Sequence, residues 1–131
     1  MAYEETLTVQ SYDANADLSA DQYKIVKVAA DDAVDTASGS TEDIIGVLQG
    51  TPESGSSANV ATAGITKVVA GEGVSAGDLV MSDADGKAEL VTIMDAGGTL
   101  GDMTRILGKV VNGAGAADEY ASVLIDKQIA G

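Results

Sequence analysis

The residues best placed for chemistry lie in "SAGDLVMSDADGKAELV", residues 75–91, where Asp83 and Asp85 are two positions apart and Gly86 follows. Calcium loops use oxygen ligands at alternating positions of this kind. An EF-hand loop counted from Asp83 needs its glycine at position 6 and a bidentate Glu at position 12. Here the glycine stands at position 4, a lysine takes a ligand position, and Met94 stands at position 12. The spacing therefore does not predict an EF-hand.

The same stretch favours a β-hairpin. Asp85-Gly86 stands between two apolar runs, and type I′ turns prefer this dipeptide because both of their central residues take positive φ. We predict two strands joined by this tight turn. A looser calcium site on Asp83 and Asp85 stays open as the alternative, because carboxylate pairs on loops can bind hard cations. We expect no metal and no cofactor.

Residue types that are missing from the chain exclude most catalytic chemistry. None of the 131 residues is Cys or His, so zinc and iron–sulfur sites of the usual kind have no ligands. A Cys nucleophile and a His general base are excluded for the same reason. The two glycine-rich stretches lack the Gly-Lys-Ser/Thr ending of a phosphate loop. We therefore predict no catalytic residues and a protein that is not an enzyme.

The charge of the chain restricts its partners. Twenty-one acids against seven bases give a formal net charge of −14, and such a chain repels nucleic-acid phosphates and anionic membranes. The N-terminus "MAYEETLTVQ" has no basic segment followed by an apolar one, and no run of about 18 apolar residues occurs. We expect no nucleic-acid partner, no membrane contact and no secretory signal.

The elements that must position these residues are predicted to be strands. Residues 6–12 alternate between apolar and polar, and short β-branched runs bounded by turn residues recur at intervals near ten residues. The fold expected is all-β, a small β-barrel or β-sandwich of about eight short strands with an extended N-terminal arm. The predicted strands are 6–12, 23–29, 44–50, 59–63, 64–71, 78–82, 87–93, 104–113 and 119–126.

The domain organisation expected is an N-terminal arm at residues 1–15 and one β-rich domain at 16–131. The core must be built from small side chains, because the chain has no Phe and no Trp. Residues 30–43 hold five acids and no base and are predicted to be an exposed loop, as is the glycine-rich segment 95–103. Interior glycines at Gly46 and Gly108 indicate bulges or close strand packing.

Two segments are candidate surfaces for a partner protein or for another copy of the chain. Between Ser54 and Gly71 the only charged residue is Lys67, so this stretch is either a neutral docking patch or a buried central strand pair, and we prefer the buried alternative. The N-terminal strand can add to the sheet edge of a partner. The candidate interface residues are Tyr3, Leu7, Val9, Tyr12, Val60, Ile65 and Val68.

The order of the motifs resembles a known family. "DLSADQYKIVKV", "IIGVLQGTPESGSSANVATAGITKVVAGEGVSAGDLVMSDADGKAELV" and "RILGKVV" follow one another over residues 17–112, as in the capsid cement, or head decoration, proteins of tailed bacteriophages. The resemblance implies a β-rich protein, often trimeric, made in the host cytoplasm. It would bind the major capsid protein on the outer face of an expanded shell and clamp capsomers against the pressure of packaged DNA, without catalytic residues.

A mechanism and two rivals follow from this resemblance. A homotrimer that engages several capsid subunits gains affinity through effective concentration. An arm of residues 1–12, disordered in the free protein, would order against the capsid. The rivals are another structural phage component, such as a tail or fibre domain, and a small calcium- or ligand-binding β module.

Overall fold

The computed structural model describes residues 2, 4–92 and 102–130, which form nine β-strands and no α-helix. The predicted all-β class is therefore confirmed. Among these residues there is no helix long and apolar enough to cross a membrane. The strands are β1 (Glu5–Ala14), β2 (Ile25–Ala30), β3 (Ala33–Thr36), β4 (Ile44–Leu48), β5 (Ser57–Val69), β6 (Leu79–Ser82), β7 (Ala88–Leu90), β8 (Thr104–Asn112) and β9 (Tyr120–Ala130).

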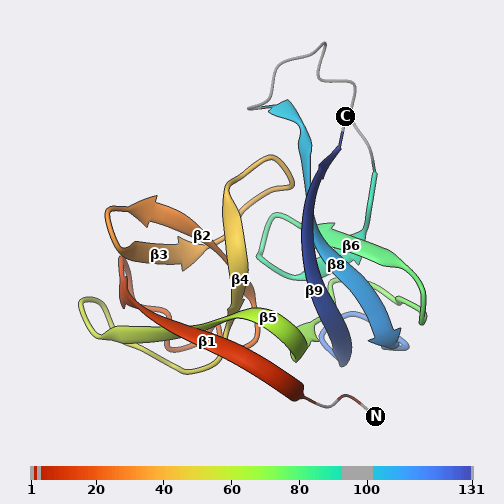
Figure 1. Ribbon diagram of the computed structural model, residues 1–131, viewed down its shortest axis with the longest axis horizontal. Coiled ribbons are helices and arrows are strands. Elements are labelled where there is room, and N and C mark those ends of the chain that lie inside the picture. Colours follow the sequence, from red (N-terminus) through yellow and green to blue (C-terminus); the bar gives the residue numbers. More distant parts are fainter. Residues whose placement is uncertain (1, 3, 93–101, 131) are drawn as a thin grey trace.

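Five strands close into a small barrel. They follow the order β1-β3-β2-β4-β5, and β5 pairs back onto β1 to complete the ring (Figure 1). The β1–β3 pair is parallel and the other four pairs are antiparallel. Closing the ring satisfies backbone groups that an open sheet edge would expose. The interior of the barrel is filled by Ala14, Leu18, Val26, Val34, Leu48, Ala58 and Val60.

The remaining strands form a second lobe that continues from β5 in the order β9-β8-β6-β7. This lobe is also drawn together at its ends, because Ala70 forms a parallel bridge with Ala88 and the Gly71 N–H donates to the Ala88 carbonyl at 2.8 Å. Its core is larger than that of the barrel. It contains Ile25, Ala37, Val47, Val68, Ala70, Val74, Val80, Ala88, Leu107, Val110, Ala114, Ala121 and Val123.

Strand β5 belongs to both lobes. Its first half pairs with β1 and β4, and residues 64–69 pair with β9. Gly64 lies between the two halves with φ of +93°, a conformation that side-chain-bearing residues rarely adopt. We predicted two strands separated at Gly64, and this was wrong: the glycine bends one 13-residue strand without ending it.

The start of β2 and the end of β4 are covered on both faces, whereas β2 is exposed from Val28 onward. Ile25 and Val47 pack in the core of the second lobe, whereas their chain neighbours Val26 and Leu48 pack inside the barrel. Consecutive residues of a strand point to opposite faces, so these two strands lie between the two cores. A strand buried on both faces has an apolar run in place of an alternating pattern, as "IV" and "VL" show here.

The prediction of an exposed loop at residues 30–43 was wrong in part. Ala33–Thr36 is strand β3, and Val34 and Ala37 are fully buried. The loop was predicted from the acidic residues of this segment. Asp31 and Asp32, however, occupy only the exposed turn between β2 and β3, where Asp32 takes a positive φ of 55°. The other predicted loop, 95–103, lies mainly outside the described residues.

The predicted N-terminal arm consists largely of β1, an extended strand that pairs with β5 between Glu5 and Asp13. It is therefore ordered in the isolated chain, unlike the disordered arm hypothesised above. Its pairing is irregular on either side of Thr8. Leu7 is half-buried and Val9 is 46% exposed, although the alternation placed both on one face.

Two interior glycines are required by close strand approach. A Cβ added at Gly46 would overlap the carbonyl oxygen of Ala61, and one at Gly108 would overlap that of Leu124. Both glycines lie beside a register shift. The predicted bulges and close packing are thus both present, and the small side chain is what allows the neighbouring strand to fit.

We predict that Gly108→Ala lowers the free energy of unfolding by about 2 kcal/mol, because the added methyl group must displace a neighbouring strand. Urea unfolding measures the loss. Gly39→Ala is the matched control, since nothing lies within 4 Å of a Cβ at that position. Equal stability of the two variants would show that β9 can move away without cost.

Deleting residues 2–12 is expected to abolish cooperative unfolding, because it removes most of the strand that closes the barrel. Circular dichroism followed during thermal unfolding tests this. Deletion of residues 2–4 alone leaves the β1–β5 pairing intact and is the control. A cooperative transition in the longer deletion would show that residues 2–12 are a dispensable arm.

Candidate functional site

The stretch that first suggested a metal loop is a hairpin in the structure. Strands β6 and β7 pair antiparallel, with Ser82 opposite Ala88. The predicted hairpin is confirmed, but the predicted type I′ turn is wrong. The loop is longer than two residues, and only Gly86 has positive φ, at 78°. A type I′ turn needs positive φ at Asp85 as well.

Asp83 holds this loop together. Its Oδ1 accepts hydrogen bonds from the backbone N–H groups of Asp85 at 2.8 Å and Lys87 at 2.9 Å. Within the described parts of the chain, no group of three or more acidic side chains could hold a metal ion. The tip of the loop is anchored on the barrel, where the Ile25 N–H donates to the Gly86 carbonyl at 2.7 Å.

The seven predicted interface residues lie in different environments. Val60 and Val68 are fully buried, one in each core, as the preferred interpretation of the neutral stretch expected. Val9 is exposed. Three more are half-buried, and Tyr3 lies outside the described residues; the half-buried residues are Leu7, Tyr12 and Ile65. The structure therefore does not gather the seven residues into one surface patch.

A continuous row of side chains does cross the outer face of the sheet. Ile65, Leu124, Lys109 and Leu79 are successive cross-strand partners on β5, β9, β8 and β6, and Glu5 of β1 continues the row beyond Ile65. Directly opposed residues share one face of a sheet. Leu124 is 42% exposed and Leu79 is 36% exposed. We call these five residues the outer row.

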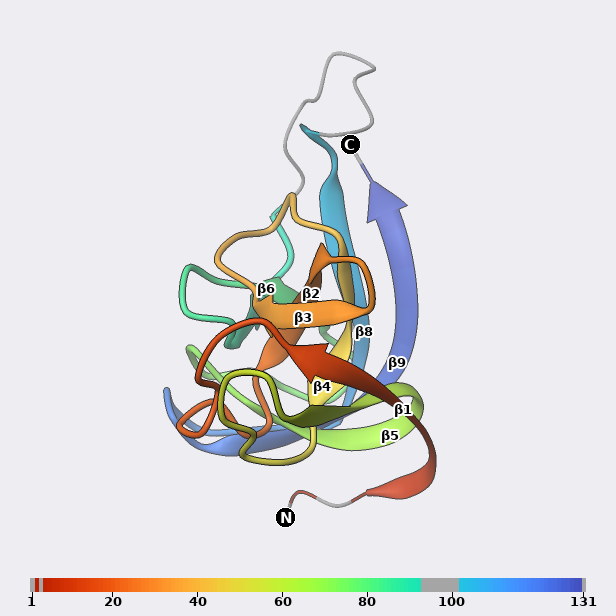
Figure 2. The ribbon, with the colours of Figure 1, turned by 90° about the vertical axis from the view of Figure 1, so that its left-hand side faces the viewer.

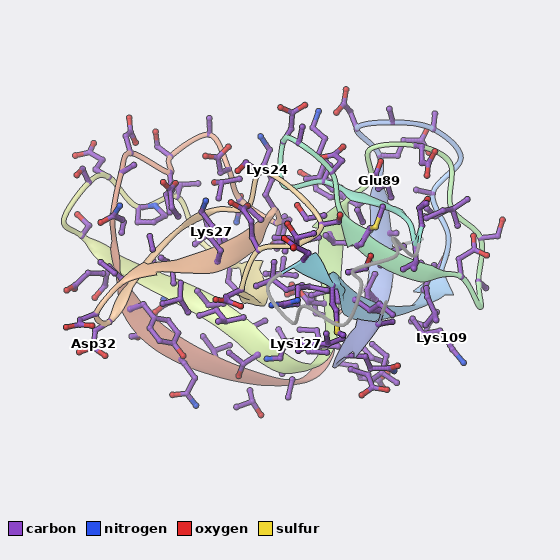
Figure 3. All side chains as sticks on the ribbon, turned by 90° about the horizontal axis from the view of Figure 1, so that it is seen from above. Lys24, Lys27, Asp32, Glu89, Lys109 and Lys127 are labelled. Atoms are coloured by element: carbon purple, nitrogen blue, oxygen red, sulfur yellow. The ribbon has the colours of Figure 1, made fainter. Side chains whose placement is uncertain are left out.

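Lys109 differs from most other bases of the chain, although Lys67 also has no acidic partner among the described residues. Among the described residues Lys109 has no ion pair and no side-chain hydrogen bond, and it projects at the periphery of the molecule (Figure 3). The Asp118 carboxylate raises the pKa of Lys87 by hydrogen bonding. Four other bases are held in pairs: Lys24–Asp21, Lys27–Glu42, Lys87–Asp118 and Arg105–Asp43.

A cleft lies where the two lobes separate. Its volume is about 260 Å³, and it is bounded by β4 on one side and by β8 and β9 on the other. Figure 2 shows β8 and β9 running side by side along one edge of the molecule toward the C-terminus. We call this hollow the seam cleft. Its lining residues are Asp43, Ile44, Ile45, Arg105, Ile106, Lys127, Gln128 and Ile129.

Lys127 lies in the seam cleft, between the lobes (Figure 3). Its Nζ donates to the Ile45 carbonyl at 2.7 Å and to the Thr62 carbonyl at 3.3 Å. Burial lowers the pKa of this ammonium group, because removal from water disfavours the charged form. A cation is thus held here by neutral carbonyl groups.

Neither the outer row nor the seam cleft was predicted from the sequence. In "ASVLID" the exposed Leu124 stands between the buried Val123 and Ile125. Because all three residues are apolar, the sequence shows no alternation that would identify the one facing solvent. The predicted strand 119–126 ended at Asp126, whereas β9 continues to Ala130 and carries Lys127 and Ile129. Only the pairing of β9 with β5 and β8 shows where these side chains lie.

Comparison with solved structures supports the fold. The N base of the head fibre gp8.5 of bacteriophage phi29 superposes with a TM-score of 0.61 at 16% sequence identity, covering 92% of this chain and 95% of that one. At this identity the likeness concerns the fold alone. No curated protein sequence matches the chain.

Comparison with family models identifies the chain more directly. The model of the phage cement proteins matches residues 10–125, which extend from β1 to β9 and include both lobes. The motif order that suggested this family on sequence is therefore recovered over nearly the whole described fold. The chain belongs to the phage cement protein family.

Proposed function

We propose that this protein decorates the outer surface of a phage capsid and stabilises the expanded shell by bridging neighbouring capsomers. The observation that carries the proposal is the match to phage cement proteins over residues 10–125. The partner is the major capsid protein, and the role is structural, without catalysis. The protein acts after synthesis in the host cytoplasm, as a component of the virion.

The charge supports a position outside the shell. With a net charge of −14, the protein would be repelled by the packaged DNA, whose phosphates carry the same sign. On the outer face of the shell the protein is separated from the DNA phosphates. Its charge also opposes nonspecific association between copies at high local concentration.

The fold supports a mechanical role. The five-strand ring is closed, and the second lobe is joined at its ends by the Ala70–Ala88 bridge. Most strands therefore have hydrogen-bonded neighbours on both sides. A force that pulls the protein apart must break the backbone hydrogen bonds of several strand pairs at once. Two closed lobes joined through one continuous strand suit a clamp between subunits that are pushed apart.

Self-association as a homotrimer would supply the avidity that bridging needs. The outer row supports such contacts because it presents exposed leucines with Lys109 near one end and Glu5 at the other. In a head-to-tail ring, the Lys109 of one copy faces the Glu5 of the next, which removes the repulsion that acidic surfaces otherwise impose.

The N-terminal region is the second contact proposed. Leu7, Val9 and Tyr12 line the start and middle of β1, and the exposed Val9 offers apolar area to a partner. We infer that this strand contacts the capsid while it also closes the barrel. Residues 1–15 would then serve both folding and attachment.

A second candidate function is the base of a head fibre. The superposition with the N base of a phage head fibre favours it. Both functions place the chain on a phage head, as the base of a fibre in one case and as a clamp on the shell in the other. Electron microscopy of particles that lack the protein separates them, since loss of a cement weakens the heads.

The protein is expected to co-sediment with expanded capsids and to remain in the supernatant with unexpanded ones. Expansion creates the subunit arrangement that a bridging protein recognises. Gel densitometry of the pelleted fractions gives the number of bound copies. Equal binding to both capsid forms would contradict stabilisation of the expanded shell.

Leu124→Asp is expected to dissociate the free oligomer, because it places a carboxylate in the middle of the proposed subunit contact. Analytical ultracentrifugation reports the mass of the particle. Leu90→Asp is the control, since Leu90 is 43% exposed and lies outside the outer row. A monomeric wild-type protein, or a variant with unchanged mass, would exclude this contact.

A further inference from the structure

We propose that the seam cleft receives an extended segment of the capsid surface protein, which adds as a strand to the open edge of β9 and carries a carboxylate to Lys127. This inference rests on the proposed function, because it names how the capsid partner is held. Membership of the family does not say which residues contact the capsid, and this inference names them.

The cleft exists because two strands share one edge of β5 and then separate. Val60 and Ala61 pair with β1 on one side and with β4 on the other, and Ile65 pairs with β1 and with β9. Strands β4 and β9 therefore lie on the same edge of β5, on either side of Thr62 and Ala63. Figure 1 shows them diverging from β5.

This separation leaves an open strand edge. Beyond Ile125, β9 pairs with β8 but has no strand neighbour on its other side among the described residues. The residues concerned are 126–130. Unpaired strand edges accept an extended peptide through backbone hydrogen bonds. Strand β1 also has an unpaired edge before Asp13, but the edge at 126–130 borders the apolar lining of the seam cleft, so we place the partner strand here.

The side chains of the cleft suit an extended occupant. Four isoleucines, Ile44, Ile45, Ile106 and Ile129, make much of the lining, and Ile129 is 51% exposed. An extended peptide turns alternate side chains to one face, so one or two apolar side chains would fill the volume of about 260 Å³. Burying Ile129 would remove apolar surface from water, which favours binding.

The charges in the cleft select an acidic segment. Lys127 has no carboxylate partner among the described residues, and its ammonium group is partly desolvated by the walls of the cleft. Nearby, the Arg105 guanidinium lies 3.4 Å from Asp43 Oδ1, and that aspartate is largely exposed at the rim. A carboxylate on the incoming strand would pair with Lys127, which is exposed but partly desolvated, and electrostatic complementarity of this kind favours an acidic segment over a basic one.

Amide hydrogen exchange provides the direct test. The wild-type protein is compared free and bound to expanded capsids, and exchange at residues 126–130 is expected to slow on binding. Unchanged exchange at 126–130 in a complex that does form would overturn the inference and leave the proposed function standing. Failure of the wild-type protein to bind capsids at all would instead remove the proposed function.

Two variants test the side chains. Ile129→Asp is expected to weaken capsid binding by roughly ten-fold or more, as loss of a central apolar contact does, while Leu90→Asp adds the same charge outside the cleft and binds as wild type. Lys127→Met is expected to reduce the salt dependence of binding. Urea unfolding confirms that each variant is folded before binding is measured.

The outcomes distinguish the alternatives. Equal binding by Ile129→Asp and Leu90→Asp would overturn the inference. Wild-type binding by Lys127→Met, together with aggregation of the free variant, would also overturn it, since the lysine would then serve only to keep the edge from pairing. If residues 126–130 are protected in the free oligomer, the occupant is a second copy of this chain and the capsid proposal for this cleft fails.

Discussion

The fold depends on one strand that changes neighbours along its length. Strand β5 is paired with β4 in its first half and with β9 in its second, and Gly64 makes the change of direction possible through its positive φ. Because β1 follows the opposite edge past this point, the two lobes stay attached while β4 and β9 separate. The barrel, the second sheet and the seam cleft all follow from this arrangement.

The interior is built in two layers and without Phe or Trp. No Phe or Trp is present, so a single thick core would be hard to fill. The chain instead builds two thin cores and places β2 and β4 between them, with Ile25 and Val47 on one side and Val26 and Leu48 on the other. Small side chains also let strands approach closely, as they do at Gly46 and Gly108.

The surface carries a strong net negative charge, and exposed apolar side chains lie next to bases without an acidic partner at two places in the described part of the chain. Most bases are paired with acids, so the strong negative charge dominates wherever no specific contact is made. The exceptions among the described residues are Lys67, which lies over the Tyr23 ring, Lys109 in the outer row and Lys127 in the seam cleft. Lys109 and Lys127 each stand beside exposed apolar side chains. Attachment through two such places agrees with a protein that must bind at defined positions and nowhere else.

Much of this protein was predictable from local pattern. The all-β class, most strands, the hairpin after Met81, the close approach at Gly46 and Gly108 and the cement family were all accessible, because period-2 alternation, turn residues and motif order are local properties. The burial of β3, the continuity of β5 through Gly64 and the outward direction of Leu124 were not accessible. These depend on which strands become neighbours: Asp13 of β1 pairs with Ala33 of β3, and Ile65 of β5 pairs with Leu124 of β9. Such pairing is decided by the packing of the two cores and not by any short stretch of sequence.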